Sequence, residues 1–301
     1  GTTALHRALA HDPQFTTFST WECLLAPSIT ARKLWLGLAA LDRRLGRPGE
    51  RLIRGGQRLL AGGMETIHPT DLAAPGGIYL ALMPILACFV LVLPFPWSGD
   101  LWRLGRFDRD ATPAERNHVM GFYRACLQRH LYVHGSHKRL LSKNASFSPM
   151  VESLAQSFPD ARFICCMRVP EQTVPSQLSS ISGGLRLFGA EPAVVYPRLI
   201  EQLAYYYAHL LAILPGLDES RHAFIDAPQM RSDMASAVRD VYTRCGLELS
   251  SEFLAALTEE DRQAKAFVSA HRYTPTQFGL SREDLRERFD FVYRDYPFGQ
   301  T

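Results

Sequence analysis

The second half of the chain alternates short apolar runs with longer segments of helical periodicity. Residues 139–142, 162–167 and 222–226 are predicted to be strands, and the unbroken apolarity of 162–167 is typical of a strand buried on both faces. Residues 149–158 and 199–213 are predicted to be helices. Strand and helix in turn indicate an α/β fold with a central parallel sheet flanked by helices. In such sheets ligands bind at the carboxyl ends of the strands.

Helix ends are marked by local signals near the C-terminus. One apolar stripe predicts a helix with Ser232 as its N-cap and Gly246 just past its end. Ser281 and Asp284 have the spacing of a capping box for a later helix. The stripe consists of Met234, Ala237, Val238, Val241, Tyr242 and Cys245.

The first half of the chain is predominantly helical in pattern. Residues 4–9 predict a helix, so Thr2 and Thr3 stand at its N-terminus, where backbone N–H groups favour an anion. The chain does not begin with methionine, and we expect a strand and part of a loop to precede Gly1. Residues 21–116 are predicted to form a helical acceptor region and 138–301 the core sheet and last helices, within a single domain spanning 1–301.

A stretch without charged residues runs from Leu72 to Gly99. Its most apolar part, within 78–97, approaches the roughly 20 residues that span a bilayer. Prolines at positions 84, 94 and 96 interrupt it, which also fits a buried helix or an apolar lid over a pocket. We keep two alternatives for this segment: peripheral membrane contact through 78–97, and a full membrane span.

Composition excludes several classes of protein. With 301 residues, 47% of them hydrophobic and 21% charged, the chain is neither a disordered tail nor a collagen-like fibre nor a disulfide-stapled miniprotein. The formal charge of +3 is small and scattered, so nucleic acid is not an expected partner. None of the six cysteines falls in a metal-ligand pattern, and we predict no metal and a reducing, cytoplasmic location. Cys165 and Cys166 are expected to point to opposite faces of their strand.

Three polar clusters follow predicted strands. They are residues 1–3, the pair Lys143 and Asn144, and Arg168. A threonine-bearing loop at a helix N-terminus, a lysine and an arginine together describe a pocket for a ligand with several phosphates or sulfates. Each cluster alone is explained equally well as an N-cap or a surface charge.

Several motifs occur in a recognisable order. The sequence FPDARF at 158–163 is followed by RVP at 168–170 and PS at 175–176. With GTT at 1–3 and KNA at 143–145, and with HRY at 271–273 and FGLS at 278–281, these segments resemble the PAPS-dependent sulfotransferases, particularly the broad bacterial family related to tyrosylprotein sulfotransferases. That family has R-D-P where this chain has Val169, and K-[NST]-P where it has Ala145.

The resemblance implies a P-loop-like three-layer fold and PAPS (3′-phosphoadenosine 5′-phosphosulfate) as co-substrate. It implies that Arg168 and Ser176 hold the 3′-phosphate and that the loop at 1–3 binds the 5′-phosphosulfate. His271 and Tyr273 are implied to lie in the same donor site. Lys143 is a candidate cation for the charge that develops during transfer. No Walker A lysine follows Gly1, so ATP is not an expected donor.

The acceptor hydroxyl needs a general base. Glu22 is the first candidate, because related enzymes carry a glutamate soon after the loop helix and its apolar neighbours Trp21 and Cys23 are expected to raise its pKa. His68 is the second candidate. Glu22 as a purely structural ion pair and His68 as a turn residue are the alternatives.

The resemblance leaves the acceptor open. The family commonly has an acidic pair near 74–77, where this chain has glycines before the apolar run. Residues 78–97 are therefore expected to form an apolar wall or a membrane-facing surface for a hydrophobic, carbohydrate or lipid-like acceptor. A membrane-associated nucleotide-binding protein without transfer activity is the main alternative, and a nucleotide kinase is a weaker one.

Overall fold

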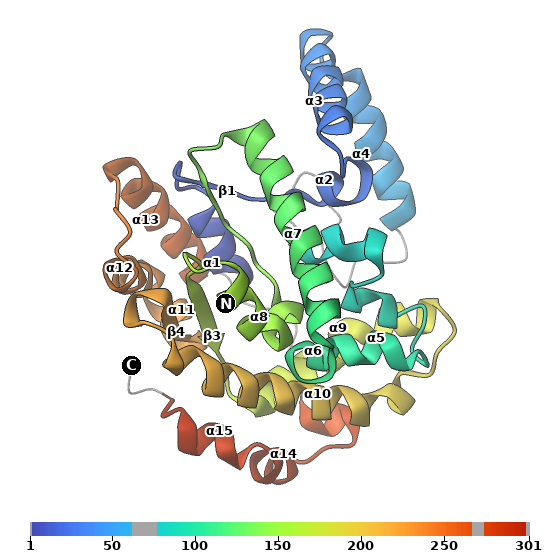
Figure 1. The fold of residues 1–301 in the computed structure, drawn as a ribbon, viewed down its shortest axis with the longest axis vertical. Coiled ribbons are helices and arrows are strands. Elements are labelled where there is room, and N and C mark those ends of the chain that lie inside the picture. The colour runs from blue at the N-terminus through green and yellow to red at the C-terminus, as the bar shows by residue number, and fades with distance from the viewer. Residues whose placement is uncertain (1, 62–76, 267–273, 299–301) are drawn as a thin grey trace.

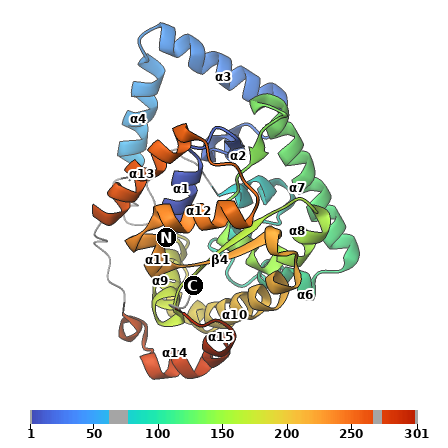
Figure 2. The ribbon, with the colours of Figure 1, turned by 90° about the vertical axis from the view of Figure 1, so that its left-hand side faces the viewer.

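Two pairs of parallel strands lie at the centre of the protein, which we describe from a computed structural model for residues 2–61, 77–266 and 274–298 (Figures 1 and 2). Strand β1 (Phe15–Thr16) pairs with β2 (Arg139–Leu140), and β3 (Phe163–Met167) pairs with β4 (His222–Asp226). The parallel pairing and the helix-rich α/β class are confirmed. The described strands form two separate two-stranded sheets rather than the single central sheet that we predicted.

Helices surround these strands. They are α1 (Thr2–Leu9), α2 (Thr20–Leu25), α3 (Ile29–Arg44), α4 (Pro48–Ala61), α5 (Gly99–Arg103), α6 (Phe107–Asp110), α7 (Pro113–His134), α8 (Val151–Ser157), α9 (Pro170–Leu187), α10 (Pro192–Ile213), α11 (Ala227–Ser232), α12 (Met234–Arg244), α13 (Ser251–Ala266), α14 (Arg282–Arg288) and α15 (Asp290–Asp295). Helices α3 and α4 form a hairpin at the edge of the molecule in both ribbon views (Figures 1 and 2).

Some element ends differ from the sequence prediction. Helix α10 begins seven residues early, because Pro192 is well suited to the first helical turn. The N-cap of α12 is Asp233 rather than Ser232: the Asp233 carboxylate accepts a bond from the Ser236 N–H at 3.0 Å, while Ser232 ends α11. The capping box of Ser281 and Asp284 at α14 is confirmed.

Strand β2 also ends earlier than predicted. It stops at Leu140, and Asn144 Nδ2 then bonds to Ser142 Oγ at 2.8 Å. The Asn144 Oδ1 atom accepts a bond from the backbone N–H of Tyr79 at 3.1 Å. The chain therefore leaves the strand to join the start of the apolar segment.

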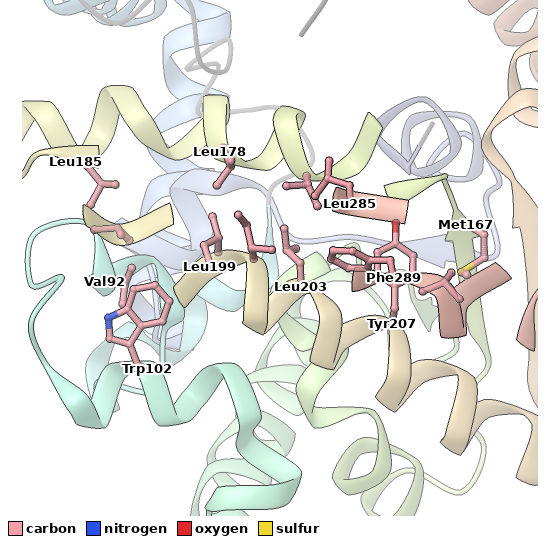
Figure 3. Close-up of a cluster of buried hydrophobic side chains, with 14 of the residues drawn as sticks. Val92, Trp102, Met167, Leu178, Leu185, Leu199, Leu203, Tyr207, Leu285 and Phe289 are labelled. Atoms are coloured by element: carbon pink, nitrogen blue, oxygen red, sulfur yellow. The ribbon is translucent and has the colours of Figure 1, made fainter. Parts of the chain in front are cut away.

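Strand β3 separates two hydrophobic cores. One core packs α9, α10, α14 and α15 together, with Leu178, Leu203 and Phe289 at its centre (Figure 3). The other joins α1, β4, α12 and α13. Cys165 packs against the first core and Cys166 against the second, which confirms that they point to opposite faces. Contact with a hydrophobic core on each face explains the unbroken apolarity of this strand.

The apolar segment 78–97 folds into two short 3₁₀ helices, η1 (Ile78–Ile85) and η2 (Phe89–Val92). Pro84 lies inside η1, and Leu86 has a positive φ of 56° directly after it. Ile78 and Leu82 are buried in a third core with Phe18. In the described ranges no helix is long and apolar enough to cross a membrane.

Candidate functional site

The end of β2 and the start of α1 meet at a hydrogen bond between residues 140 positions apart. Lys143 Nζ donates to Thr3 Oγ1 at 3.1 Å. Burial lowers the pKa of Lys143, which forms no ion pair with the described part of the chain. Thr2 and Thr3 are exposed at the helix N-terminus. An ammonium group and the free N–H groups of α1 thus converge on one position, which favours an anion.

The neighbouring His6 side chain does not compensate the positive charge of Lys143. Burial and the charge of Lys143 together lower the pKa of His6 to about 4, so its ring is neutral at pH 7. Its Nε2 atom lies 3.0 Å from Thr17 Oγ1. This contact with Thr17 holds the His6 ring beside the Lys143 ammonium.

A second cationic position lies between β3 and α9. Arg168 Nε donates to Gln172 Oε1 at 3.1 Å, and the Arg168 carbonyl accepts a bond from Tyr207 Oη at 2.5 Å. Gln172 and Ser176 are four residues apart and share a face of α9. Burial, and then the like charge of Arg231, lower the pKa of Arg168.

Neither guanidinium of Arg168 and Arg231 has a carboxylate partner within the ranges that the structure describes. Two neighbouring arginines without such a partner are a setting in which a phosphate or sulfate is stabilised. Val169, at the N-cap of α9, provides no side-chain cap. Replacing the family's aspartate by valine thus leaves no carboxylate at this position.

The two cationic positions belong to one structural unit. Leu141, just after β2, and Ile164 and Cys166 of β3 pack against the core that includes α1. Between the described residues, no hydrogen bond or ion pair joins Lys143 to Arg168. The other predicted donor-site residues, Gly1, His271 and Tyr273, and the base candidate His68 lie outside the described residues.

Glu22 is buried at the start of α2 within a set of hydrogen-bond donors. Ser19 donates to Glu22 Oε2 from its backbone N–H at 2.9 Å and from its hydroxyl at 2.8 Å. His134 Nε2 lies 2.6 Å from Glu22 Oε1, and Arg32 Nε lies 3.8 Å from the same oxygen. Both Glu22 and Arg32 are 2% exposed.

The prediction that the pKa of Glu22 is raised is wrong. Burial does oppose its ionisation, but the hydrogen bonds of His134 and Ser19, together with the His130 imidazole 3.5 Å away, outweigh burial and hold the pKa of Glu22 well below its usual range. The apolar neighbours in the sequence do not reveal these donors, because two of them come from α7, more than 100 residues away. Glu22 is therefore ionised at neutral pH.

His130 and His134 are functional candidates that our sequence reasoning missed. Their spacing of four residues on α7 was the available signal. The rings stack with centroids 4.3 Å apart, and His130 Nε2 lies 2.9 Å from Thr16 Oγ1. Thr17, the partner of His6, directly follows Thr16, so the end of strand β1 and the residue after it connect the Glu22 cluster with the Lys143 position.

Glu22, His130 and His134 also place three groups of metal-ligand type within 4.8 Å of one another. The Arg32 guanidinium, 3.8 Å from the same Glu22 oxygen, opposes a further cation there. We therefore interpret the cluster as a network of hydrogen bonds and ion pairs around an ionised carboxylate.

The low pKa of Glu22 predicts how stability changes in acid. A carboxyl whose pKa is lower in the folded state than its usual 4.5 contributes stability above that pH, and the contribution is lost as the pH falls towards the folded value. We expect urea unfolding to show that the stability advantage of the wild type over Glu22→Gln shrinks between pH 5 and pH 3. An advantage that stays constant over this interval contradicts the lowered pKa.

Comparisons with known proteins identify the family of the chain. The sequence profile of the "Sulfotransferase family" matches residues 98–251, slightly more than half of the chain, including Lys143, Arg168 and Ser176. No curated protein matches the chain. The crystal structure of sulfotransferase STF9 from Mycobacterium avium has a TM-score of 0.76 at 17% identity, over 99% of this chain and 74% of that one.

Sulfotransferase STF1 from Mycobacterium tuberculosis H37Rv has a TM-score of 0.67 at 19% identity, over 96% of this chain and 73% of that one. At these identities the structural likeness shows the fold. The family profile, which includes β3, β4 and the Arg168 segment between them, shows the kinship. This chain therefore belongs to the sulfotransferase family.

Proposed function

We propose that this protein transfers a sulfuryl group from PAPS to a hydroxyl acceptor. The observation that carries the proposal is that Lys143 and Arg168, half-buried cations after β2 and β3, have no carboxylate partner in the described structure. Leaving a cation partly desolvated and unpaired is unfavourable unless an anion binds beside it. PAPS carries anionic groups at both its 5′ and 3′ positions, which suits two such cations.

Two groups of residues bind the two anionic ends of PAPS. Thr2, Thr3 and the N–H groups of α1 bind the 5′-phosphosulfate, with Gly1 before them. Arg168 and Ser176 bind the 3′-phosphate, and Arg231 adds positive charge on that side.

Transfer forms a bond between sulfur and the acceptor oxygen as the bond from sulfur to the oxygen bridging to the 5′-phosphate breaks. Lys143 is fixed beside Thr3 before the reaction starts, and its ammonium stabilises the charge that grows on the bridging oxygen. Glu22, already ionised, accepts the proton of the acceptor hydroxyl.

The acceptor side is formed by the apolar segment. Asn144, next to Lys143, bonds to the backbone of Tyr79 at the start of η1 and so attaches 78–97 to the cationic position. Helix α2, which carries Glu22, also packs against η1. An apolar wall beside both the cation and the base supports a hydrophobic acceptor.

Binding of 3′-phosphoadenosine 5′-phosphate, measured by calorimetry against ATP, tests the donor site. We expect Arg168→Ala to weaken binding of the 3′-phosphorylated nucleotide by about 1.5–3 kcal/mol, roughly ten- to a hundredfold, because a charge-assisted contact is lost. Arg186→Ala, an exposed arginine at the other end of α9, is the matched control and is expected to bind normally.

Two results oppose the proposal. Equal binding of both nucleotides, or equal losses in the two arginine variants, would show that Arg168 does not read a 3′-phosphate. Tight binding without transfer of radiolabelled sulfate to any of a panel of hydrophobic and hydrophilic alcohols would favour the binding protein without transfer activity.

A further inference from the structure

The α3–α4 hairpin carries nearly half of the exposed large hydrophobic side chains in the described structure. Leu34, Leu38, Leu41 and Leu45 follow one another at helical spacing and are 61%, 46%, 52% and 66% exposed. They lie on one face of α3, and the buried Arg32 lies on the opposite face. Helix α3 therefore exposes a stripe of leucines on the face opposite Arg32, its one buried residue.

Helix α4 also carries exposed apolar side chains. Leu52 and Ile53 are 79% and 53% exposed, and Trp35 is 43% exposed on α3. The Asp42 carboxylate accepts a hydrogen bond from the backbone N–H of Gly49 at 2.6 Å and so joins the end of α3 to the start of α4. Both ribbon views place this hairpin at the outer edge of the molecule (Figures 1 and 2). An apolar surface of this extent marks a site of interaction.

Basic residues are frequent on the same hairpin. Residues 29–61 contain eight basic and two acidic residues, whereas the whole chain contains 33 and 30. The net positive charge of the chain is thus concentrated on the hairpin. Both acidic residues are engaged within it: Asp42 caps α4, and Glu50 lies 3.4 Å from Arg47. The exposed arginines are Arg43, Arg44, Arg47 and Arg51.

We infer that the α3–α4 hairpin docks on the surface of an anionic lipid bilayer. Leucines and a tryptophan beside arginines are the combination by which interfacial helices bind the headgroup region, with apolar side chains buried and basic ones on anionic lipid. A second copy of the chain fits less well, because a twofold contact through this face brings the same arginines together. This surface is distinct from 78–97 and involves none of the residues assigned to PAPS.

Sedimentation of the protein with vesicles tests the docking surface. Vesicles of phosphatidylcholine with phosphatidylglycerol are expected to bind the protein at low salt, and vesicles of phosphatidylcholine alone to bind it much less. The triple variant Leu34→Gln, Leu38→Gln, Leu41→Gln is expected to lose at least about tenfold in binding, because its apolar contact is removed. Arg44→Gln is expected to lose roughly fivefold, with a weaker dependence on salt.

The control removes exposed apolar side chains elsewhere. Leu187→Gln with Phe188→Gln, at the end of α9, changes residues that are 62% and 54% exposed and is expected to bind vesicles normally. Equal binding to both kinds of vesicle, or undiminished binding by the triple variant, overturns the inference. So does a dimer in solution that the triple variant dissociates while vesicles bind neither form. Nucleotide binding by the triple variant is expected to be unchanged, so failure of vesicle binding says nothing against the donor site.

Discussion

Glu22→Gln is expected to lower turnover about 100- to 1,000-fold while leaving nucleotide binding intact. Glutamine keeps an oxygen for the two Ser19 donors but cannot take the proton of the acceptor. General bases contribute about 100- to 10,000-fold, and we expect the lower part of that range because a carboxylate with a lowered pKa is a weak base. The measurement is the rate of sulfate transfer at saturating PAPS.

A structural role for Glu22 has to be separated from a catalytic one. Glu22 is the ion-pair partner of the buried Arg32, and removing one member of a buried pair costs about 3–5 kcal/mol of stability. Glu22→Asp keeps the charge beside Arg32 but withdraws the carboxylate by one methylene. We expect it to keep most of the stability and little of the activity.

Recovery of both properties in Glu22→Asp would mean that Glu22 only holds the network together. Near-normal turnover in Glu22→Gln would remove it from the role of base. The same assay on His68→Asn would then test the remaining candidate.

Lys143→Met is expected to reduce turnover by a similar factor, about 100- to 1,000-fold, because it removes a donor that is in place before charge develops. The effect is expected in the rate of transfer more than in the KM for the acceptor. Burial lowers the pKa of Lys143, which shows that the folded protein disfavours its ammonium. An apolar side chain of similar length should therefore leave the thermal stability unchanged or slightly higher.

A loss of activity without loss of stability is the signature that distinguishes this role from a structural one. Lys138→Met, on the segment before β2, removes an equal charge and is the matched control. If both lysine variants slow transfer equally, the effect comes from general electrostatics rather than from the position beside Thr3.

The local sequence was sufficient to predict elements whose signals are local. The cores of β3 and β4 were predicted because a strand buried on both faces needs an unbroken apolar run, and their parallel pairing follows from the helices between them. The capping box at Ser281 was predicted because cap and partner are three residues apart. Ser232 was misassigned because its neighbour Asp233 is also a good cap.

The order of short motifs identified the family to which the chain belongs. The same motifs made Arg168, Ser176 and Lys143 candidates for the site. The sequence did not reveal that Arg168 lacks a carboxylate partner and has Arg231 nearby, because that neighbour comes from α11, 63 residues away. The apolar segment 78–97 was ambiguous because a span, a lid and a buried segment share the same composition.

By itself, then, the sequence determined the α/β class, the family resemblance, and the residue types at the ends of β2 and β3. Only the tertiary structure decided the charge of Glu22, the contact between Thr3 and Lys143, and the outward face of α3. The physical reason is the distance along the sequence over which each signal acts. Strand, helix and cap signals depend on neighbours a few residues apart, whereas a pKa, an unpaired cation or an exposed leucine depends on which distant side chains fold against it.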